Sequence, residues 1–129
     1  MLPIILSPLQ VPRTKSTHFI LNMNVYRNTH YQTLNKVKQN YKEQMTAQLS
    51  QLPKLDRVQL VYTLYPASRR LCDITNVCSV HSKFFLDSLV ELAILPDDNY
   101  HHVIRETFQF GYVDRTNPRV EIAIQPVTT

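Results

Sequence analysis

Apolar residues recur at strand and helix spacings along most of the chain, and these spacings predict its elements. Alternation over residues 17–23 predicts a strand, and the polar and aromatic residues 24–32 that follow predict a loop. A helix is predicted over residues 34–51, capped by Thr33. One stripe of its surface is apolar and made of Leu34, Val37, Tyr41, Met45 and Leu49.

The second half of the chain continues with the clearest strand, over residues 55–65. A second helix is predicted over much of 76–93, and two strands near 102–110 and 119–125. We expect residues 111–118 to form a hairpin loop that pairs the last two strands antiparallel. The order β-α-β-α-β-β indicates a single small α+β domain, with a mixed sheet and helices packed on one face.

The N-terminal residues 1–16 hold three prolines and are predicted to be an extended arm along a domain formed by residues 17–129. The apolar run 2–6 is short and lacks a preceding basic flank, so it makes a poor signal peptide. No stretch approaches the ~20 apolar residues that span a bilayer, and no membrane partner is expected.

Composition narrows the classes of function. The chain has 129 residues, of which 43% are apolar, as in globular proteins. Its one glycine, Gly111, excludes a Walker loop and a dinucleotide fingerprint, which both need several glycines. Two cysteines, Cys72 and Cys78, make no disulfide framework and suggest a reducing compartment.

The net charge of +4 hides an asymmetry along the chain. Up to Leu71 there are ten basic residues and two acidic ones, whereas the remainder has four basic and eight acidic. Such a split indicates polyanion binding. Candidate phosphate contacts in the basic half are Arg13, Lys15, Arg27, Lys36, Lys38 and Lys42, although lysines on a helix face are more often simply solvated.

Residues 69–76 lie where a strand gives way to a helix and combine two kinds of chemistry. Arg69 and Arg70 can grip phosphate oxygens, and Asp73 with Asn76 suits a hard cation such as Mg²⁺. The alternative is that Asp73 or Thr75 only caps the helix and that the arginines form a solvated corner.

A polar stripe follows on the otherwise apolar second helix, made of Asn76, Lys83 and Asp87. An ion pair between Lys83 and Asp87 is the plain explanation, because they are four residues apart. We favour that explanation for Asp87 and a functional role for Lys83.

Asp97 and Asp98 form the second acidic element, in a loop. Their context is good turn chemistry. With Asp73 they could instead surround a metal ion that activates water at a phosphodiester.

Taken in order, these elements resemble the RusA family of small Holliday-junction resolvases from phages and prophages. The resemblance spans about residues 18–125 and is most specific over 69–98. It is carried by Asp73-Ile-Thr-Asn76, Lys83, Asp87-Ser-Leu and Pro96-Asp97-Asp98, and upstream by Asn24-Val-Tyr-Arg27. The chain departs from the family pattern at Thr75, where an Asp is usual, and in a longer stretch from Asn76 to Lys83.

The resemblance implies a homodimeric, Mg²⁺-dependent endonuclease, with Mn²⁺ as a substitute, that resolves four-way DNA junctions in recombination, repair or phage DNA processing. Its place would be the cytoplasm of a bacterium or an infected host. Asp73 and Asp98 would be catalytic acids that bind the metal beside Asp97, and Lys83 would contact the scissile phosphate. DNA would be held by Arg27, Lys36, Lys38, Arg69, Arg70 and Asn76.

The spacing of the acids constrains this site. A helix over 76–92 would be ~25 Å long, and the residues 93–97 can retrace at most ~18 Å. We therefore expect the regular helix to begin later, near residues 79–82. The alternative is that acids from two subunits combine.

Other candidates have plainer explanations. Cys72, Cys78 and His81 have the wrong spacing for a structural zinc site, so buried thiols are favoured. The pair His101 and His102 could ligate a metal, but a solvated start of a strand is favoured. Residues left open are Glu106, either a further acid of the site or an ion-pair partner, and the tyrosines Tyr26 and Tyr31, either base-stacking or core residues.

Two other functions compete with nuclease activity. The first is a branched-DNA binding protein whose catalysis is weakened or lost through Thr75. The second is a structural partner protein in which the acidic loop is only a turn.

Overall fold

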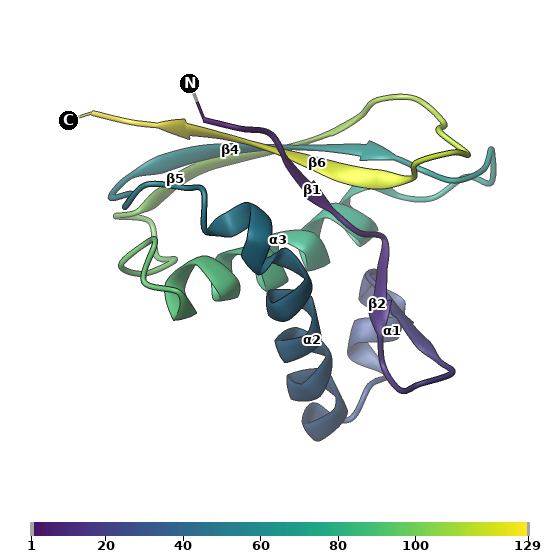
Figure 1. The fold of residues 1–129 in the computed structure, drawn as a ribbon. Helices are drawn as coiled ribbons and strands as arrows, with labels where there is room; N and C mark the ends of the chain where they lie inside the picture. Colours follow the sequence, from purple (N-terminus) through teal and green to yellow (C-terminus); the bar gives the residue numbers. More distant parts are fainter. Residues whose placement is uncertain (1, 129) are drawn as a thin grey trace.

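The computed structural model describes residues 2–128, and its centre is a four-stranded mixed sheet of order β1-β6-β4-β5 (Figure 1). Strand β4 pairs in parallel with β5 and antiparallel with β6, which also pairs antiparallel with β1. The predicted α+β class and mixed sheet are confirmed. The strands are β1 (Ile5–Ser7), β4 (Val58–Tyr65), β5 (Val103–Phe110) and β6 (Arg119–Pro126).

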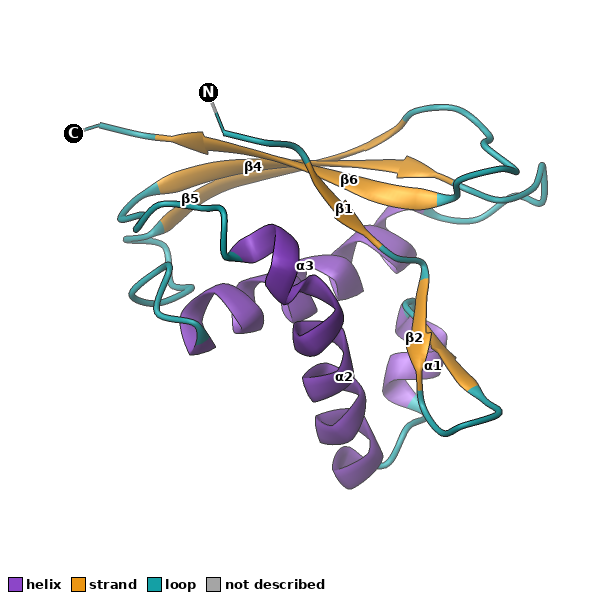
Figure 2. Ribbon diagram, viewed as in Figure 1, coloured by secondary structure: helices purple, strands orange, loops and turns teal. Residues whose placement is uncertain are grey.

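The helices cover one face of this sheet, as predicted (Figure 2). The two long helices are α2 (Tyr31–Leu49) and α3 (Ile74–Glu91). The short helix α1 (Met23–Arg27) and a two-stranded sheet of β2 (Gln10–Pro12) and β3 (His18–Ile20) lie beside them. None of the helices within the described chain is both long and apolar enough to cross a membrane.

Alternation explains why β4 lies in the middle of the sheet. Its face toward the helices is fully buried, whereas its other face is half-exposed. A strand with this much apolar surface gains most where both edges are paired and a helix covers one face. The buried residues are those that the alternation predicts, Val58, Leu60, Tyr62 and Leu64.

The expected hairpin of the last two strands is wrong, because β5 and β6 lie on opposite sides of β4. The crossover through α3 brings β5 back parallel to β4. Residues 111–118 then pass over the end of β4, where Gly111 N donates to Leu64 O and Asp114 N to Pro66 O, both at 2.9 Å. The order of the strands along the chain therefore does not show that β6 pairs with β4 rather than with β5.

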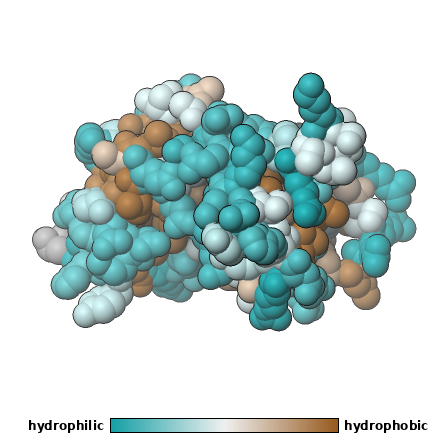
Figure 3. Space-filling view, turned by 90° about the horizontal axis from the view of Figure 1, so that it is seen from below, coloured by the Kyte–Doolittle hydropathy of each residue, from teal (hydrophilic) through white to brown (hydrophobic). Residues whose placement is uncertain are grey.

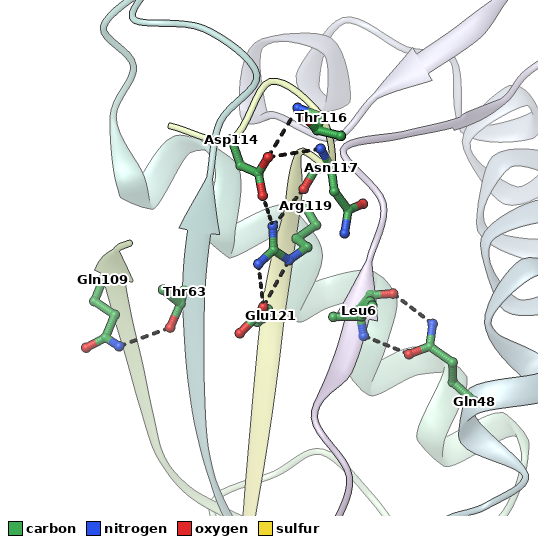
Figure 4. Close-up of polar contacts among 9 residues, drawn as sticks. All are labelled: Leu6, Gln48, Thr63, Gln109, Asp114, Thr116, Asn117, Arg119 and Glu121. Carbon is green, nitrogen blue, oxygen red and sulfur yellow. Dashed lines mark hydrogen bonds and ion pairs between the residues drawn. The ribbon is translucent and has the colours of Figure 1, made fainter. Parts of the chain in front are cut away.

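Arg119 holds this crossover segment in place (Figure 4). Its guanidinium donates to Asp114 at 2.8 Å and to Glu121 at 2.9 Å, and it lies 4.1 Å from the centre of the Tyr65 ring. Asp114 in turn accepts from the backbone of Thr116 and Asn117. A segment that looks like a loop is thus fixed by charge-assisted bonds.

The apolar stripe of α2 packs as predicted, with Val37, Tyr41, Met45 and Leu49 buried. The helix begins earlier than expected, because His30 rather than Thr33 caps it and accepts from Gln32 N at 3.2 Å. The expected loop over residues 24–32 instead contains α1, which Asn22 caps by accepting from Val25 N at 2.8 Å.

Helix α3 is continuous over 18 residues, so the expected late start near residues 79–82 is wrong. Its rise is about 27 Å. Nine of its residues are buried, which agrees with its apolar sequence. Ser82 does not cap a helix here, because it is buried and its hydroxyl donates to Glu106 at 2.7 Å.

The N-terminal segment is extended but is not an arm outside a domain of residues 17–129, because β1 belongs to the main sheet and β2 pairs with β3. Strand β1 forms one edge of the main sheet, and Gln48 of α2 bonds both the N–H and the carbonyl of Leu6 (Figure 4). Beneath it, the buried Ser7 hydroxyl lies 2.7 Å from the Tyr41 hydroxyl and 2.6 Å from Nδ1 of His81. Buried polar groups must be hydrogen-bonded, so these contacts fix the register of β1.

Candidate functional site

The polar stripe of α3 begins where α1 docks on it. Asn76 Oδ1 accepts from the backbone N–H of Met23 at 3.1 Å, which joins two segments 53 residues apart in sequence. Between them lies a groove of about 430 Å³, here called the seam groove. Its polar lining consists of Asn22, Asn24, Ser68, Arg70, Cys72 and Asn76.

Asp73 lies beside the seam groove as the residue that precedes α3. It occupies the N-cap position, yet its side chain makes no capping hydrogen bond, and the residue is exposed. The explanation that Asp73 only caps the helix is therefore not supported by its geometry. Its carboxylate is free to meet a cation or a protonated ligand in solution.

The arginines next to Asp73 are also free of internal partners. Arg69 and Arg70 are exposed, and within residues 2–128 neither forms an ion pair. Arg70 lines the seam groove, whereas Arg69 faces a neighbouring apolar pocket near Phe110. An uncompensated guanidinium beside a groove is the arrangement that binds phosphate oxygens.

Lys83 lies about two turns after Asn76 on the polar stripe of α3, and it is exposed. Its Nζ is 5.7 Å from the centre of the Tyr26 ring, and Lys38 Nζ is 5.9 Å from the same ring. The expected ion pair between Lys83 and Asp87 is wrong, because Lys38 of α2 reaches Asp87 at 3.3 Å. Lys83 is thus left without an acidic partner among the described residues.

Asp97 and Asp98 lie beyond the other end of α3, in an exposed turn. Asp97 accepts from Asp98 N at 2.7 Å and from the Asn99 side chain at 3.0 Å, so the turn chemistry is present. The pKa of the Asp98 carboxyl is raised, first by partial removal from water and then by the carboxyl groups of Asp97 and Asp87. A cation at this point would relieve that repulsion.

Helix α3 separates the two sets of acids within one chain. Asp73 precedes its first residue and Asp97 follows its last, and the helix between them rises about 27 Å. The sheet also places the two sets of acids at opposite ends. The loop after Asp98 reaches the start of β4, where Val58 N donates to His102 O, whereas Asp73 follows the end of β4. A metal ion shared by Asp73 and Asp98 of the same chain is therefore excluded.

The donors present still suit Mg²⁺, which takes one or two carboxylates and keeps several waters. Within residues 2–128 of one chain, no three His, Cys, Asp or Glu side chains are grouped to hold a metal. Asp97 with Asp98 supplies two carboxylates at one end, and Asp73 supplies one at the other. Two copies related by a two-fold axis, with their α3 helices antiparallel, would bring all three together.

The remaining candidates fall outside this arrangement. Glu106 accepts from the Tyr62 hydroxyl at 2.6 Å and from the Ser82 hydroxyl at 2.7 Å, so it joins β5 to α3. Cys78 is buried, which raises its pKa to about 12, but Cys72 is exposed, contrary to the prediction of two buried thiols. His102 contacts Asp56, with Nδ1 2.7 Å from its carbonyl oxygen, while His101 is exposed.

The two open tyrosines differ. Tyr26 is half-buried against Phe84, with ring centres 6.3 Å apart, whereas Tyr31 is exposed and lies against His30. Sequence reasoning missed Asn22 and Ser68, which line the seam groove. The role of Asn22 could have been predicted, because an Asn just before a helix commonly caps it by accepting from a backbone N–H of the first turn.

Comparison with models of known protein families finds no match to this chain, and comparison with curated proteins finds no relative.

Proposed function

We propose that this protein is a RusA-like endonuclease that uses Mg²⁺ to cut four-way DNA junctions and works as a homodimer. The observation that carries the proposal is the free carboxylate of Asp73 at the seam groove, beside Arg70 and Asn76. Within residues 2–128 the side chains of Asp73 and Arg70 form no ion pair, and Asn76 is held beside them by its bond to Met23 N, which favours a ligand with phosphate oxygens and a bound cation.

The site is composite in this proposal. Asp73 of one copy and Asp97 with Asp98 of the other would hold the ion, because one chain keeps them at opposite ends of α3. When bound, Mg²⁺ would make water more acidic and offset charge on the phosphate. A two-fold axis would place two such sites facing two strands, as junction resolution requires.

The other residues of the stripe bind and orient the DNA. Arg70 and Arg69 hold phosphate oxygens, and Asn76 is fixed by its bond to Met23. Lys83 has no acid partner in the described part of the chain and lies over Tyr26, and in this proposal it balances charge at the scissile phosphate. Arg27 and Lys36 are exposed and extend the basic surface, whereas Lys38 is engaged by Asp87 and contributes less.

A second candidate is a branched-DNA binding protein without catalysis. Thr75, which is exposed at the start of α3, favours it, because a threonine hydroxyl there replaces a carboxylate that a cation would bind more strongly. Binding to junctions is common to both functions, so cleavage decides between them.

The test is cleavage of a synthetic four-way junction with and without Mg²⁺. Wild type should cut only with the ion, and Asp98→Asn should cut about 100-fold more slowly or worse. Asp56→Asn is the matched control, because the Asp56 side chain is 82% exposed and contacts His102 rather than any of the proposed metal ligands. Equal cutting by wild type and Asp98→Asn would refute the assignment of Asp98, and tight binding without cutting by wild type would favour the second candidate.

A further inference from the structure

A second groove lies between α2 and the loop that joins β2 to β3. Its volume is about 660 Å³, and it is here called the hairpin groove. One wall is the loop, with Arg13 and Lys15, and the other is α2, with Lys36, Asn40 and Glu43. The face on which α1, α2 and this loop lie is largely hydrophilic (Figure 3).

Both walls of the hairpin groove are held by hydrogen bonds. Asn40 of α2 donates to Pro12 O at 2.8 Å, and the loop closes through Arg13 N and Thr14 N, which both donate to Thr17 O. Val11 and Phe19 are buried beneath it. The basic side chains therefore stand on a preorganised frame, which lowers the entropy lost on binding.

The hairpin groove continues to the seam groove. Arg13 also lines a small groove with Asn24 and Asn28, and Asn24 in turn lines the seam groove. The three grooves thus share residues and form one track along the surface. The track runs from α2 to Arg70 and passes α1 on the way.

The charges on the track are mostly positive, and its basic side chains are not neutralised by ion pairs within the described residues. Arg13, Lys15 and Lys36 are exposed, and none forms an ion pair within the described chain, while Glu43 is the one acid of the hairpin groove. In contrast, Lys38 and Lys42 on the same helix are bound by Asp87 and Glu91 of α3. The basic residues of α2 therefore fall into two groups. Lys38 and Lys42 pair with acids of α3, whereas Lys36 has no such partner among the described residues.

We propose that this track binds the sugar-phosphate backbone of a DNA duplex, the arm that leaves the seam groove. The inference rests on the proposed function, since it extends that site. The hairpin groove and its continuation are lined by no aromatic side chain on which a base could stack. Contacts to phosphate without contacts to bases give binding that does not depend on sequence.

The test compares two charge-matched double variants in binding to a long-armed junction over a range of salt, with Ca²⁺ in place of Mg²⁺. The variant K15A/K36A removes two charges from the track. The control R105A/R115A removes two exposed charges from β5 and the 111–118 segment. Loss of two phosphate contacts should flatten the slope of log K against log salt by about 2 and weaken binding about 10-fold or more. The control should bind as wild type.

Three outcomes would overturn the inference: K15A/K36A binding with the affinity and slope of the control, an equal loss on single-stranded DNA, or no DNA binding by wild type. Cleavage by wild type is scored separately. If wild type does not cut, but K15A/K36A alone loses duplex-dependent affinity, the track is supported and the proposed nuclease function fails. If wild type cuts and the track variant binds normally, the opposite holds.

Discussion

Single residues decide how the site can be interpreted, and Asp73 is the clearest case. A carboxylate at an N-cap is normally explained by its bond to the helix backbone, which stabilises a helix by about 1 kcal/mol. Asp73 makes no such bond, whereas Asn22 at the start of α1 does. Asn22 therefore has a capping role that the Asp73 side chain lacks.

We predict that Asp73→Asn leaves the free energy of unfolding within about 0.5 kcal/mol of wild type but abolishes junction cleavage. Asn22→Ala, which removes a real cap, should lower the free energy of unfolding by about 1 kcal/mol. Urea denaturation measures both. A loss of stability in Asp73→Asn as large as that in Asn22→Ala would return Asp73 to a structural role.

His81 is a buried histidine whose burial contributes to the loss of stability in acid. It is fully buried. Its Nδ1 is hydrogen-bonded with the Ser7 hydroxyl, and its Nε2 has no hydrogen-bond partner within residues 2–128. Burial lowers its pKa from 6.5 to about 3. The neutral ring is favoured in the folded state, so its contribution is complete above pH 6.5 and is lost as the pH falls toward 3.

The free energy of unfolding should therefore fall by about 1.4 kcal/mol per pH unit below pH 6.5 through this group. Urea denaturation at pH 7, 6, 5 and 4, in steps of about one pH unit, measures this slope. His81→Asn removes the titration, so its slope should be shallower by about one proton whatever its absolute stability. Parallel slopes for the two proteins between pH 6 and 4 would contradict the assignment to His81.

Among the elements, those with a strong apolar period were predicted well. The stripe of α2 and the buried face of β4 follow from local spacing, because burial of one face requires it. The start of α3 was not, because the expected late start assumed that Asp73 and Asp98 of one chain share a metal ion, whereas the helix is continuous over 18 residues.

Strand pairing depends on contacts that no local pattern records. The position of β6 between β1 and β4 requires residues 111–118 to cross the end of β4, and Arg119 fixes that path only in the folded chain. The site divides similarly. Its residue types and order could be predicted from the sequence, but the separation of Asp73 from Asp98 depends on the full length of α3.

Gly111 is the first residue of the segment that crosses from β5 to β6. A Cβ at this position would lie 2.4 Å from Cε1 of Tyr65, whose ring is held by Arg119 and packs edge-on against Tyr112. The close approach of backbone to ring therefore requires glycine. The backbone angle does not, since no glycine here has a positive φ.

We predict that Gly111→Ala lowers the free energy of unfolding by about 1–3 kcal/mol through this overlap. Gly111→Ala in a Tyr65→Leu background should cost less, because the ring atoms that clash are gone. Urea denaturation of the four proteins in this cycle measures the coupling. Equal costs in the two backgrounds would show that the Tyr65 ring is not the cause.

At the scale of the whole molecule, we propose that one chain carries two half-sites at opposite ends of α3. This arrangement explains why the acids of the resemblance do not meet within a chain, and why Asp73, Arg70 and Lys83 lack internal acid or base partners among the described residues. A homodimer would complete both sites together. Activity would then depend on assembly as well as on each residue.

The most direct test is complementation between two inactive variants. Asp73→Asn and Asp98→Asn are co-expressed with different tags, and the mixed dimer is purified through both. If acids of two copies combine, one site of the mixed dimer carries both substitutions and the other carries neither. Each variant alone should cut the junction about 100-fold more slowly than wild type or worse, whereas the mixed dimer should nick one of the two opposed strands in Mg²⁺. A mixed dimer as inactive as its parents, beside a wild type that cuts, would contradict the composite site.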